Sequence, residues 1–189
     1  MGEPVEPQLS ASQFVAWESD QPHKFELQHG YVLAFAGGTI DHDRMSFNMR
    51  TALENRFSLP CRTFGSEVKI RVAPETMYYA DAGVTCDGVT GSDLTIEKPR
   101  VVCEVLSPST RSFDLIEKRA AYRAMRSLTA IVFIHTAMRR VEIDRRDSLD
   151  AWHTEFVDHR DFEIGNGAIA LDAIYALTDL ANPTPDFPA

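Results

Sequence analysis

The sequence predicts an α/β (α+β) domain with a mixed β-sheet core flanked by helices. Strand-like apolar runs, such as "RVVCEVLS" at 100–107 and "TAIVFIHT" at 129–136, alternate with segments whose apolar residues recur at helical spacing. The composition, with 44% hydrophobic and 25% charged residues, is ordinary for a globular domain. A length of 189 residues suits one domain, expected at 10–180. Five of the ten prolines lie in the tails, 1–9 and 181–189, which we expect to be disordered.

The first third of the chain predicts a helix, a hairpin and a second helix. Ser10 is a suitable N-cap for a short helix at 10–18. The stretch "KFELQHGYVLAFA" reads as two strands joined at His29-Gly30. Residues 41–57 then carry apolar side chains at helical spacing, namely Met45, Met49, Leu53 and Phe57.

The remaining two thirds predict mainly strands. "CRTFGSEVKIRV" supplies two short strands or one bent strand, and "YYADAGVTC" and "RVVCEVLS" two more, separated by a polar loop. A helix opened by Ser112 is expected at 112–126. The strands "TAIVFIHT", "RRVEIDR" and "WHTEFVD" follow it, and a short helix is expected at 172–180.

Charge and cysteine content restrict the function classes. The net charge of −9 argues against a large basic surface for nucleic acid or anionic membrane, although metal ions could neutralise a small acidic site. The three cysteines, Cys61, Cys86 and Cys103, show no C-x-x-C spacing, so we expect buried thiols in a reducing compartment. Neither a signal peptide nor a membrane-spanning run is evident, which predicts a cytoplasmic protein with no membrane partner.

Glu104 is an acidic residue in the middle of an apolar strand. An ionised group in apolar surroundings is costly unless it is paired, so Glu104 needs a structural partner or a chemical use. In a strand it shares a face with Val102 and Leu106, whereas Cys103 and Val105 face the other way.

Asp81 is a second isolated acid, in the preceding predicted strand. If the two strands pair antiparallel with residue 83 opposite Glu104, Asp81 is a diagonal neighbour on the same face. A slip of one residue would send the two acids to opposite faces. Two adjacent carboxylates repel each other unless a cation lies between them. Oxygen ligands on strands suit a hard cation, so the pair predicts Mg²⁺ or Mn²⁺.

Lys118 lies on the predicted inward face of the 112–126 helix, together with Leu115, Tyr122 and Met125. Its ammonium could reach the acids and there hold a water molecule or stabilise charge on a phosphate. Glu26, in the first hairpin, could face the same site or be solvated. His42, at the start of the second helix, could cap it, bind substrate or be solvated.

"FELQHGYV", the His42 helix, Asp81, "VVCEVLSPSTRSFD" and "EKRAAYRA" together resemble the Uma-type restriction endonuclease family of the PD-(D/E)xK nuclease superfamily, over about residues 10–180. That superfamily usually places a lysine two residues after the second acid, where this chain has Leu106. In the Uma-type group the following helix supplies the lysine, and Lys118 is the matching position. The chain also departs from the family at Ala80, which is usually proline, and in the run "VFIHTAMRR".

The resemblance implies a restriction-endonuclease-like core and Mg²⁺-dependent cleavage of DNA. Asp81 and Glu104 would bind the metal with the backbone carbonyl of Val105. Lys118 would orient the nucleophile, and Glu26 would assist a metal-bound water. Cutting both strands of a duplex would favour a homodimer.

A second interpretation stays open, in which Glu104 and Lys118 form a structural ion pair. The chain would then be a catalytically silent, dimeric interaction or regulatory protein. The two interpretations differ in whether basic residues line the acid cluster, and the candidates are Lys69, Arg71, Arg111, Arg119 and Arg123.

Overall fold

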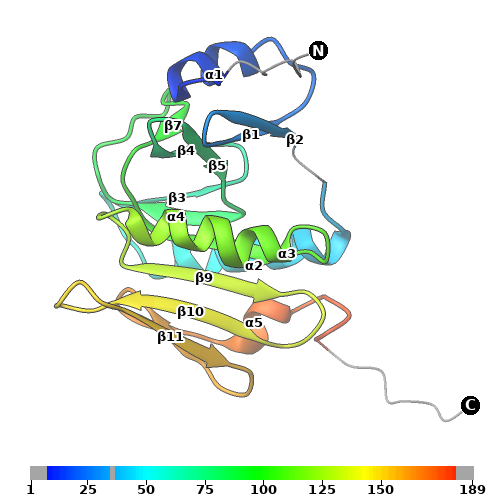
Figure 1. Cartoon of the computed structure of the whole chain (residues 1–189). Coiled ribbons are helices and arrows are strands. Elements are labelled where there is room, and N and C mark those ends of the chain that lie inside the picture. Colours follow the sequence, from blue (N-terminus) through cyan, green and yellow to red (C-terminus); the bar gives the residue numbers. More distant parts are fainter. Residues whose placement is uncertain (1–7, 35–36, 182–189) are drawn as a thin grey trace, which may run out of the picture.

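The computed structural model describes residues 8–34 and 37–181 (Figure 1). Its central sheet is built from β3 (Arg62–Gly65), β6 (Ala82–Thr85), β8 (Pro99–Leu106), β9 (Ala130–His135), β10 (Val141–Arg146) and β11 (Trp152–Val157). The strand order is β11-β10-β9-β8-β6-β3. β8 and β9 are parallel and their outer neighbours are antiparallel, so the sheet is mixed, as the sequence predicts.

A second, smaller sheet contains β1 (Phe25–Gln28), β2 (Tyr31–Ala34), β4 (Lys69–Ala73), β5 (Thr76–Tyr79) and β7 (Thr95–Ile96). Its order is β2-β1-β5-β4-β7, and the β4–β7 pair is parallel. A separate hairpin is formed by β12 (Phe162–Ile164) and β13 (Gly167–Ile169). The sequence did not predict β5 as a separate strand, nor β7, β12 and β13.

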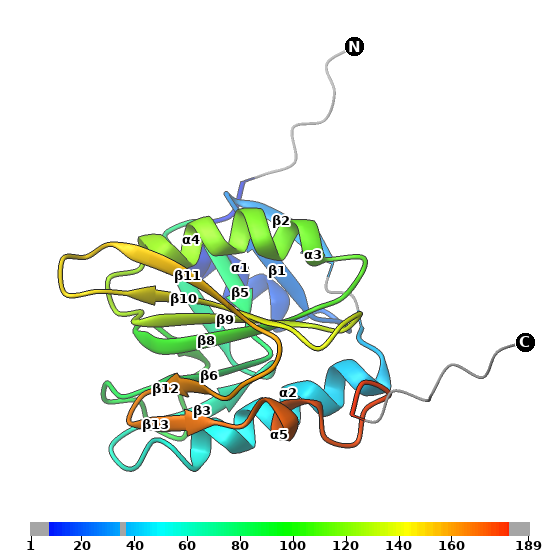
Figure 2. The ribbon, with the colours of Figure 1, turned by 90° about the horizontal axis from the view of Figure 1, so that it is seen from below.

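The helices are α1 (Ala11–Glu18), α2 (Ile40–Glu54), α3 (Arg111–Phe113), the π-helical turn η1 (Asp114–Lys118), α4 (Arg119–Ala124) and α5 (Leu171–Tyr175). α2 and α5 lie on one face of the central sheet, and the continuous α3–η1–α4 segment lies on the other (Figures 1 and 2). The second sheet and α1 stack beyond that segment (Figure 1). The core is therefore divided by the central sheet.

The alternation along β8 follows the prediction. Cys103 and Val105 pack with Met45 and Met49 of α2, whereas Val102 and Leu106 pack with α4 and the second sheet. Glu104 therefore enters the layer between the two sheets.

Local signals placed most elements to within a few residues. Ser10 caps α1 through a capping box with Gln13, and the first hairpin turns at His29-Gly30, both at positive φ. The last two residues of the predicted hairpin, 35–36, lie outside the described residues. The α3–η1–α4 segment follows Thr110, not Ser112, and α5 ends at Tyr175.

The predicted strand "YYADAGVTC" is in fact two strands of different sheets. β5 ends at Tyr79 in the second sheet, and β6 begins at Ala82 in the central sheet. Asp81 lies in the short crossing between them. This break places Asp81 where the two sheets part.

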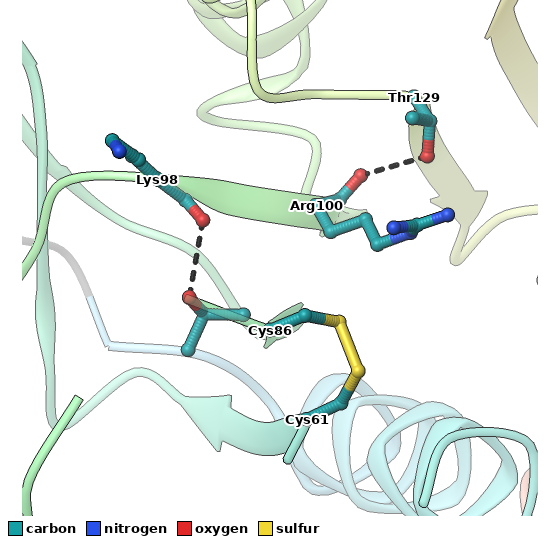
Figure 3. Close-up of a disulfide and its surroundings, with 6 residues drawn as sticks. Cys61, Cys86, Lys98, Arg100 and Thr129 are labelled. Carbon is teal, nitrogen blue, oxygen red and sulfur yellow. Dashed lines mark hydrogen bonds between the residues drawn. A yellow bond between two sulfur atoms is a disulfide. The ribbon is translucent and has the colours of Figure 1, made fainter. Parts of the chain in front are cut away.

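A disulfide joins Cys61 and Cys86, which immediately precede β3 and follow β6 (Figure 3). The expectation of buried thiols is therefore wrong for these two cysteines and right for Cys103, which is free and buried. The bond forms because Arg62 and Thr85 are partners in the antiparallel register. Cys61, just before Arg62, therefore lies opposite Cys86, just after Thr85. Only the non-local pairing of β3 with β6 brings them together.

A buried charge network holds α4 against the central sheet. Asp144 of β10 is fully buried and accepts hydrogen bonds from Arg123 Nε at 2.8 Å and Thr154 Oγ1 at 2.7 Å. Arg119 Nε lies 3.2 Å from the same carboxylate. At the outer edge of the sheet, Glu155 of β11 pairs with Arg145 at 3.3 Å.

The tails predicted to be disordered fall almost wholly in 1–7 and 182–189, outside the described residues, so that prediction stays untested. In the part of the chain that is described, no helix is long and apolar enough to cross a membrane.

Replacing Asp144 with alanine should lower the free energy of unfolding by about 3–5 kcal/mol, because it leaves two arginines without their buried partner. Urea denaturation measures the loss. Asp20→Ala, at an exposed position, should change the value by less than about 0.5 kcal/mol. Equal effects of the two substitutions would contradict this account of how α4 is held.

The Cys61→Ser/Cys86→Ser variant should lose about 3 kcal/mol of unfolding free energy, because the bond closes a loop with a sequence separation of 25 residues. Dithiothreitol should lower the urea midpoint of the wild type and leave that of the variant unchanged. Three titratable thiols in the denatured, unreduced wild type would show that the bond is absent.

Candidate functional site

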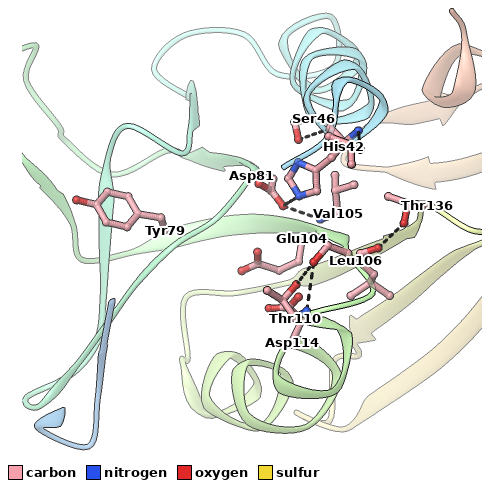
Figure 4. Close-up of polar contacts among 12 residues, drawn as sticks. His42, Ser46, Tyr79, Asp81, Glu104, Val105, Leu106, Thr110, Asp114 and Thr136 are labelled. Atoms are coloured by element: carbon pink, nitrogen blue, oxygen red, sulfur yellow. Dashed lines mark hydrogen bonds and ion pairs between the residues drawn. The ribbon is translucent and has the colours of Figure 1, made fainter. Parts of the chain in front are cut away.

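A cavity of about 420 Å³ opens between the two sheets, beside the α3–η1–α4 segment. All six residues that the sequence singled out for the site line it. They come from β1, α2, the β5–β6 crossing, β8 and η1, and are Glu26, His42, Asp81, Glu104, Val105 and Lys118. Figure 4 shows Asp81 next to His42 of α2, with Glu104 of β8 nearby.

Asp81 lies opposite Glu104 when the β6–β8 register is continued by one residue beyond the Ala82–Cys103 pair. The sequence placed residue 83 opposite Glu104, which is wrong by two residues, since Gly83 pairs with Val102. An even slip would keep the same face of a continued strand. Asp81 lies just before β6, however, and contacts His42 of α2, so what the structure shows is that both acids line one cavity.

Asp81 is held by β8 and by α2. Its Oδ2 accepts a hydrogen bond from the Val105 backbone N–H at 2.7 Å and lies 3.4 Å from His42 Nε2. His42 therefore sits against the acid, at the start of α2 after the Thr39 cap. Burial lowers the pKa of His42, but the hydrogen bond and charge of Asp81 and the backbone of Val105 outweigh it, so the pKa is raised.

Lys118 is buried among three carboxylates. Its Nζ lies 2.9 Å from Glu26 Oε1, 3.4 Å from Glu104 Oε1 and 3.7 Å from Asp114 Oδ1. Burial lowers the pKa of Lys118, but the three negative charges raise it above its ordinary value, so the ammonium stays charged. Glu26 also accepts the Tyr79 backbone N–H at 2.9 Å.

Glu104 is almost fully buried, and burial raises its pKa well above its ordinary value while Lys118 opposes the rise. Its Oε1 accepts a hydrogen bond from the Tyr122 hydroxyl at 2.6 Å as well as one from Lys118. Its Oε2 has no hydrogen-bond partner among the described residues. One oxygen of the carboxylate is therefore anchored and the other is available.

Asp114 is a site residue that the sequence reading missed. It is buried, lines the cavity and pairs with Lys118, and burial raises its pKa. The sequence does contain a signal for Asp114. It stands four residues before Lys118 and eight before Tyr122, so all three share one helix face. An acid in the first turn of a helix is ordinarily assigned to the helix dipole.

The basic residues whose placement separates the two interpretations do not line the cavity. Lys69 pairs with Glu18 at 2.8 Å, and Arg71 pairs with Glu97 at 3.1 Å. Arg119 and Arg123 serve the Asp144 network, and Arg111 is exposed outside the cavity lining. Among the described residues of the lining, Lys118 is the one lysine or arginine.

The cavity carries a large excess of negative groups. Against Lys118 and His42 it presents five acidic side chains, Glu26, Asp43, Asp81, Glu104 and Asp114. Within the described ranges, no three His, Cys, Asp or Glu side chains converge closely enough to hold a metal ion by themselves. A cation bound here would take one or two protein carboxylates and complete its shell from other donors.

Lys118→Met should destabilise the protein by about 3–5 kcal/mol at pH 8, since it leaves buried carboxylates unpaired. Without the ammonium, the carboxyl pKa values rise further above those of the unfolded chain. The native variant then binds more protons, so its stability should increase as the pH is lowered from 8 to 5.

Urea denaturation at both pH values measures the effect. Lys98→Met, at an exposed lysine 4.0 Å from Asp87, is the matched control and should change stability little at either pH. A loss for Lys118→Met that does not vary with pH would contradict the proposed pairing.

Two proteins of Synechocystis sp. (strain ATCC 27184 / PCC 6803 / Kazusa) are similar to this chain. "Uncharacterized protein slr1290" is 27% identical over 175 residues, which cover 89% of this chain and 92% of that protein. "Uncharacterized protein sll1609" is 27% identical over 139 residues, which cover 71% and 78%.

The fold is that of a solved structure, described as the "Crystal structure of a putative nuclease belonging to DUF820 from Anabaena variabilis ATCC 29413". The TM-score is 0.69 at 12% identity, with 88% of this chain and 97% of that chain covered. Residues 11–171 match the sequence profile of the Uma2 family, which is described as "Putative restriction endonuclease". The chain, with this fold and this match over most of its length, belongs to the Uma2 family.

Proposed function

We propose that the protein is a metal-dependent endonuclease that hydrolyses phosphodiester bonds of DNA. The observation that carries the proposal is the charge of the cavity, where five carboxyl groups face one lysine and one histidine. Three of the five, Glu26, Glu104 and Asp114, are buried, and buried carboxylates in excess of their cations must take up protons or bind further cations. The family description, "Putative restriction endonuclease", supports a nuclease as the protein that would use those cations.

The donors fit Mg²⁺ or Mn²⁺. Asp81 and Glu104 would each offer a carboxylate oxygen, and the Val105 carbonyl is the third proposed ligand. Mg²⁺ keeps several waters and is commonly bound by one or two carboxylates together with substrate phosphate. A site with fewer than three convergent protein ligands is therefore compatible with this ion.

A bound divalent cation would supply activated water and would neutralise charge on the phosphate. The side chains of the chain have separate roles around it. Lys118 keeps its proton and would donate hydrogen bonds to a phosphate oxygen or an attacking water. Glu26 would hold Lys118 and assist a water molecule. His42 would hold Asp81 and contact the substrate from α2.

Two further parts of the proposal concern assembly and location. Cleavage of both strands of a duplex favours a homodimer with two-fold symmetry. We propose a cytoplasmic location, where the protein would meet DNA. The Cys61–Cys86 bond argues against that location, because disulfides persist mainly in oxidising compartments. Thiol trapping in cell extracts would test whether the bond is present in the cell.

A second candidate function has its own support. Lys118 is already paired with three carboxylates, and four of the five basic residues considered neutralise acids elsewhere. A catalytically silent, dimeric interaction or regulatory protein would need nothing more from this site than a structural ion pair.

Calorimetric titration with Mn²⁺ and Mg²⁺, followed by cleavage of supercoiled plasmid DNA, tests the proposal. Wild type should bind both ions and nick the plasmid. Asp81→Asn and Glu104→Gln should weaken binding and lower the cleavage rate by about 100-fold or more, beyond the loss typical of an outer-shell partner. Asp43→Asn, an exposed lining position with the same charge change, should have a much smaller effect.

Lys118→Met should retain metal binding and lose cleavage. Wild type that binds no metal, with or without DNA, would overturn the proposal and favour the silent protein. Cleavage that persists at the wild-type rate in both Asp81→Asn and Glu104→Gln would contradict the roles given to these two residues.

A further inference from the structure

The hydroxyl of Tyr122 contacts the proposed ligand Glu104 from outside the cavity. Tyr122 lies in α4, one helical turn beyond Lys118, and is absent from the residues that line the cavity. Its hydroxyl donates to Glu104 Oε1 at 2.6 Å, and both side chains are almost fully buried. It therefore cannot meet a substrate, but it can act through Glu104.

The Tyr122 ring is fixed by the core. It packs edge-to-face with the ring of Tyr78, with centroids 5.7 Å apart, in the cluster that also contains Phe133 and Leu106. Because close-packed side chains rarely leave their rotamers, the core sets the position of the hydroxyl. Burial and the neighbouring Glu104 raise the pKa of Tyr122 well above its ordinary value, so the hydroxyl remains a donor.

The hydrogen bonds on Glu104 are one-sided. Oε1 receives Tyr122 at 2.6 Å and Lys118 at 3.4 Å, whereas Oε2 has no hydrogen-bond partner in the described part of the chain. Lys118 is nearer to Glu26, at 2.9 Å, so it restrains Glu104 less closely than Tyr122 does. The hydrogen bond from the Tyr122 hydroxyl is the shorter of the two on Oε1, and it leaves Oε2 of Glu104 for another ligand.

We propose that Tyr122 is a positioning residue that holds Glu104 with Oε2 directed to a cation. This inference rests on the proposed function, since it concerns the same cation site. Partners that orient metal-binding carboxylates typically contribute about 10–100-fold to metal affinity.

The test is calorimetric titration of Mn²⁺ into wild type, Tyr122→Phe and Tyr78→Phe. Tyr78 is the matched control, because it is equally buried in the same aromatic pair and its hydroxyl bonds to Gln28 instead of Glu104. Tyr122→Phe should weaken Mn²⁺ binding about 10–100-fold. Tyr78→Phe should leave the affinity within about three-fold of wild type, and thermal melts should show both variants folded.

Tyr122→4-aminophenylalanine, which keeps an N–H donor at the ring position of the hydroxyl, should restore much of the affinity. Wild-type affinity in a folded Tyr122→Phe would overturn the inference alone. A Tyr122→Phe variant that does not fold, beside a folded Tyr78→Phe, would assign the hydroxyl to folding and also overturn it. Absence of Mn²⁺ binding by wild type would overturn the proposed function together with the inference.

Discussion

The ammonium of Lys118, buried among three carboxylates, is the interaction on which the meeting of the two sheets depends. Glu26 comes from the second sheet, Glu104 from the central sheet and Asp114 from the helical segment between them. None of these carboxylates could remain ionised in that layer without a positive partner. The same contact therefore joins three parts of the fold and leaves a surplus of negative charge at the cavity.

Local periodicity was sufficient to predict part of this site. Alternation along β8 placed Glu104 on the face of Val102 and Leu106, which in the structure faces the second sheet, and helical spacing placed Lys118 on the inward face. The exact pairing of Asp81 with Glu104 could not be predicted, because the chain changes sheets before β6 and the β6–β8 register shifts at Val84. The Cys61–Cys86 bond was missed for a related reason, since it depends on the pairing of strands distant in sequence.

The net negative charge of the chain explains why few basic residues are free to line the cavity. With 28 acidic and 19 basic residues, most arginines and lysines have an acid to neutralise nearby. Lys69 and Arg71 of β4 each do so, and so does Arg123 of α4. A phosphate entering the cavity would find few protein cations, so its binding would depend on whatever cations the carboxylates hold.

The pairing of Glu155 with Arg145 at the outer edge of β11 has a consequence for self-association. An uncovered edge strand offers unpaired backbone groups to other chains, and charged side chains discourage such pairing. β11 carries Glu155, and its His153 Nε2 lies 2.7 Å from Asp147 Oδ2, just after β10. The opposite edge is β3, with only four residues. A charged edge on one side and a short one on the other make the sheet a poor template for aggregation during folding.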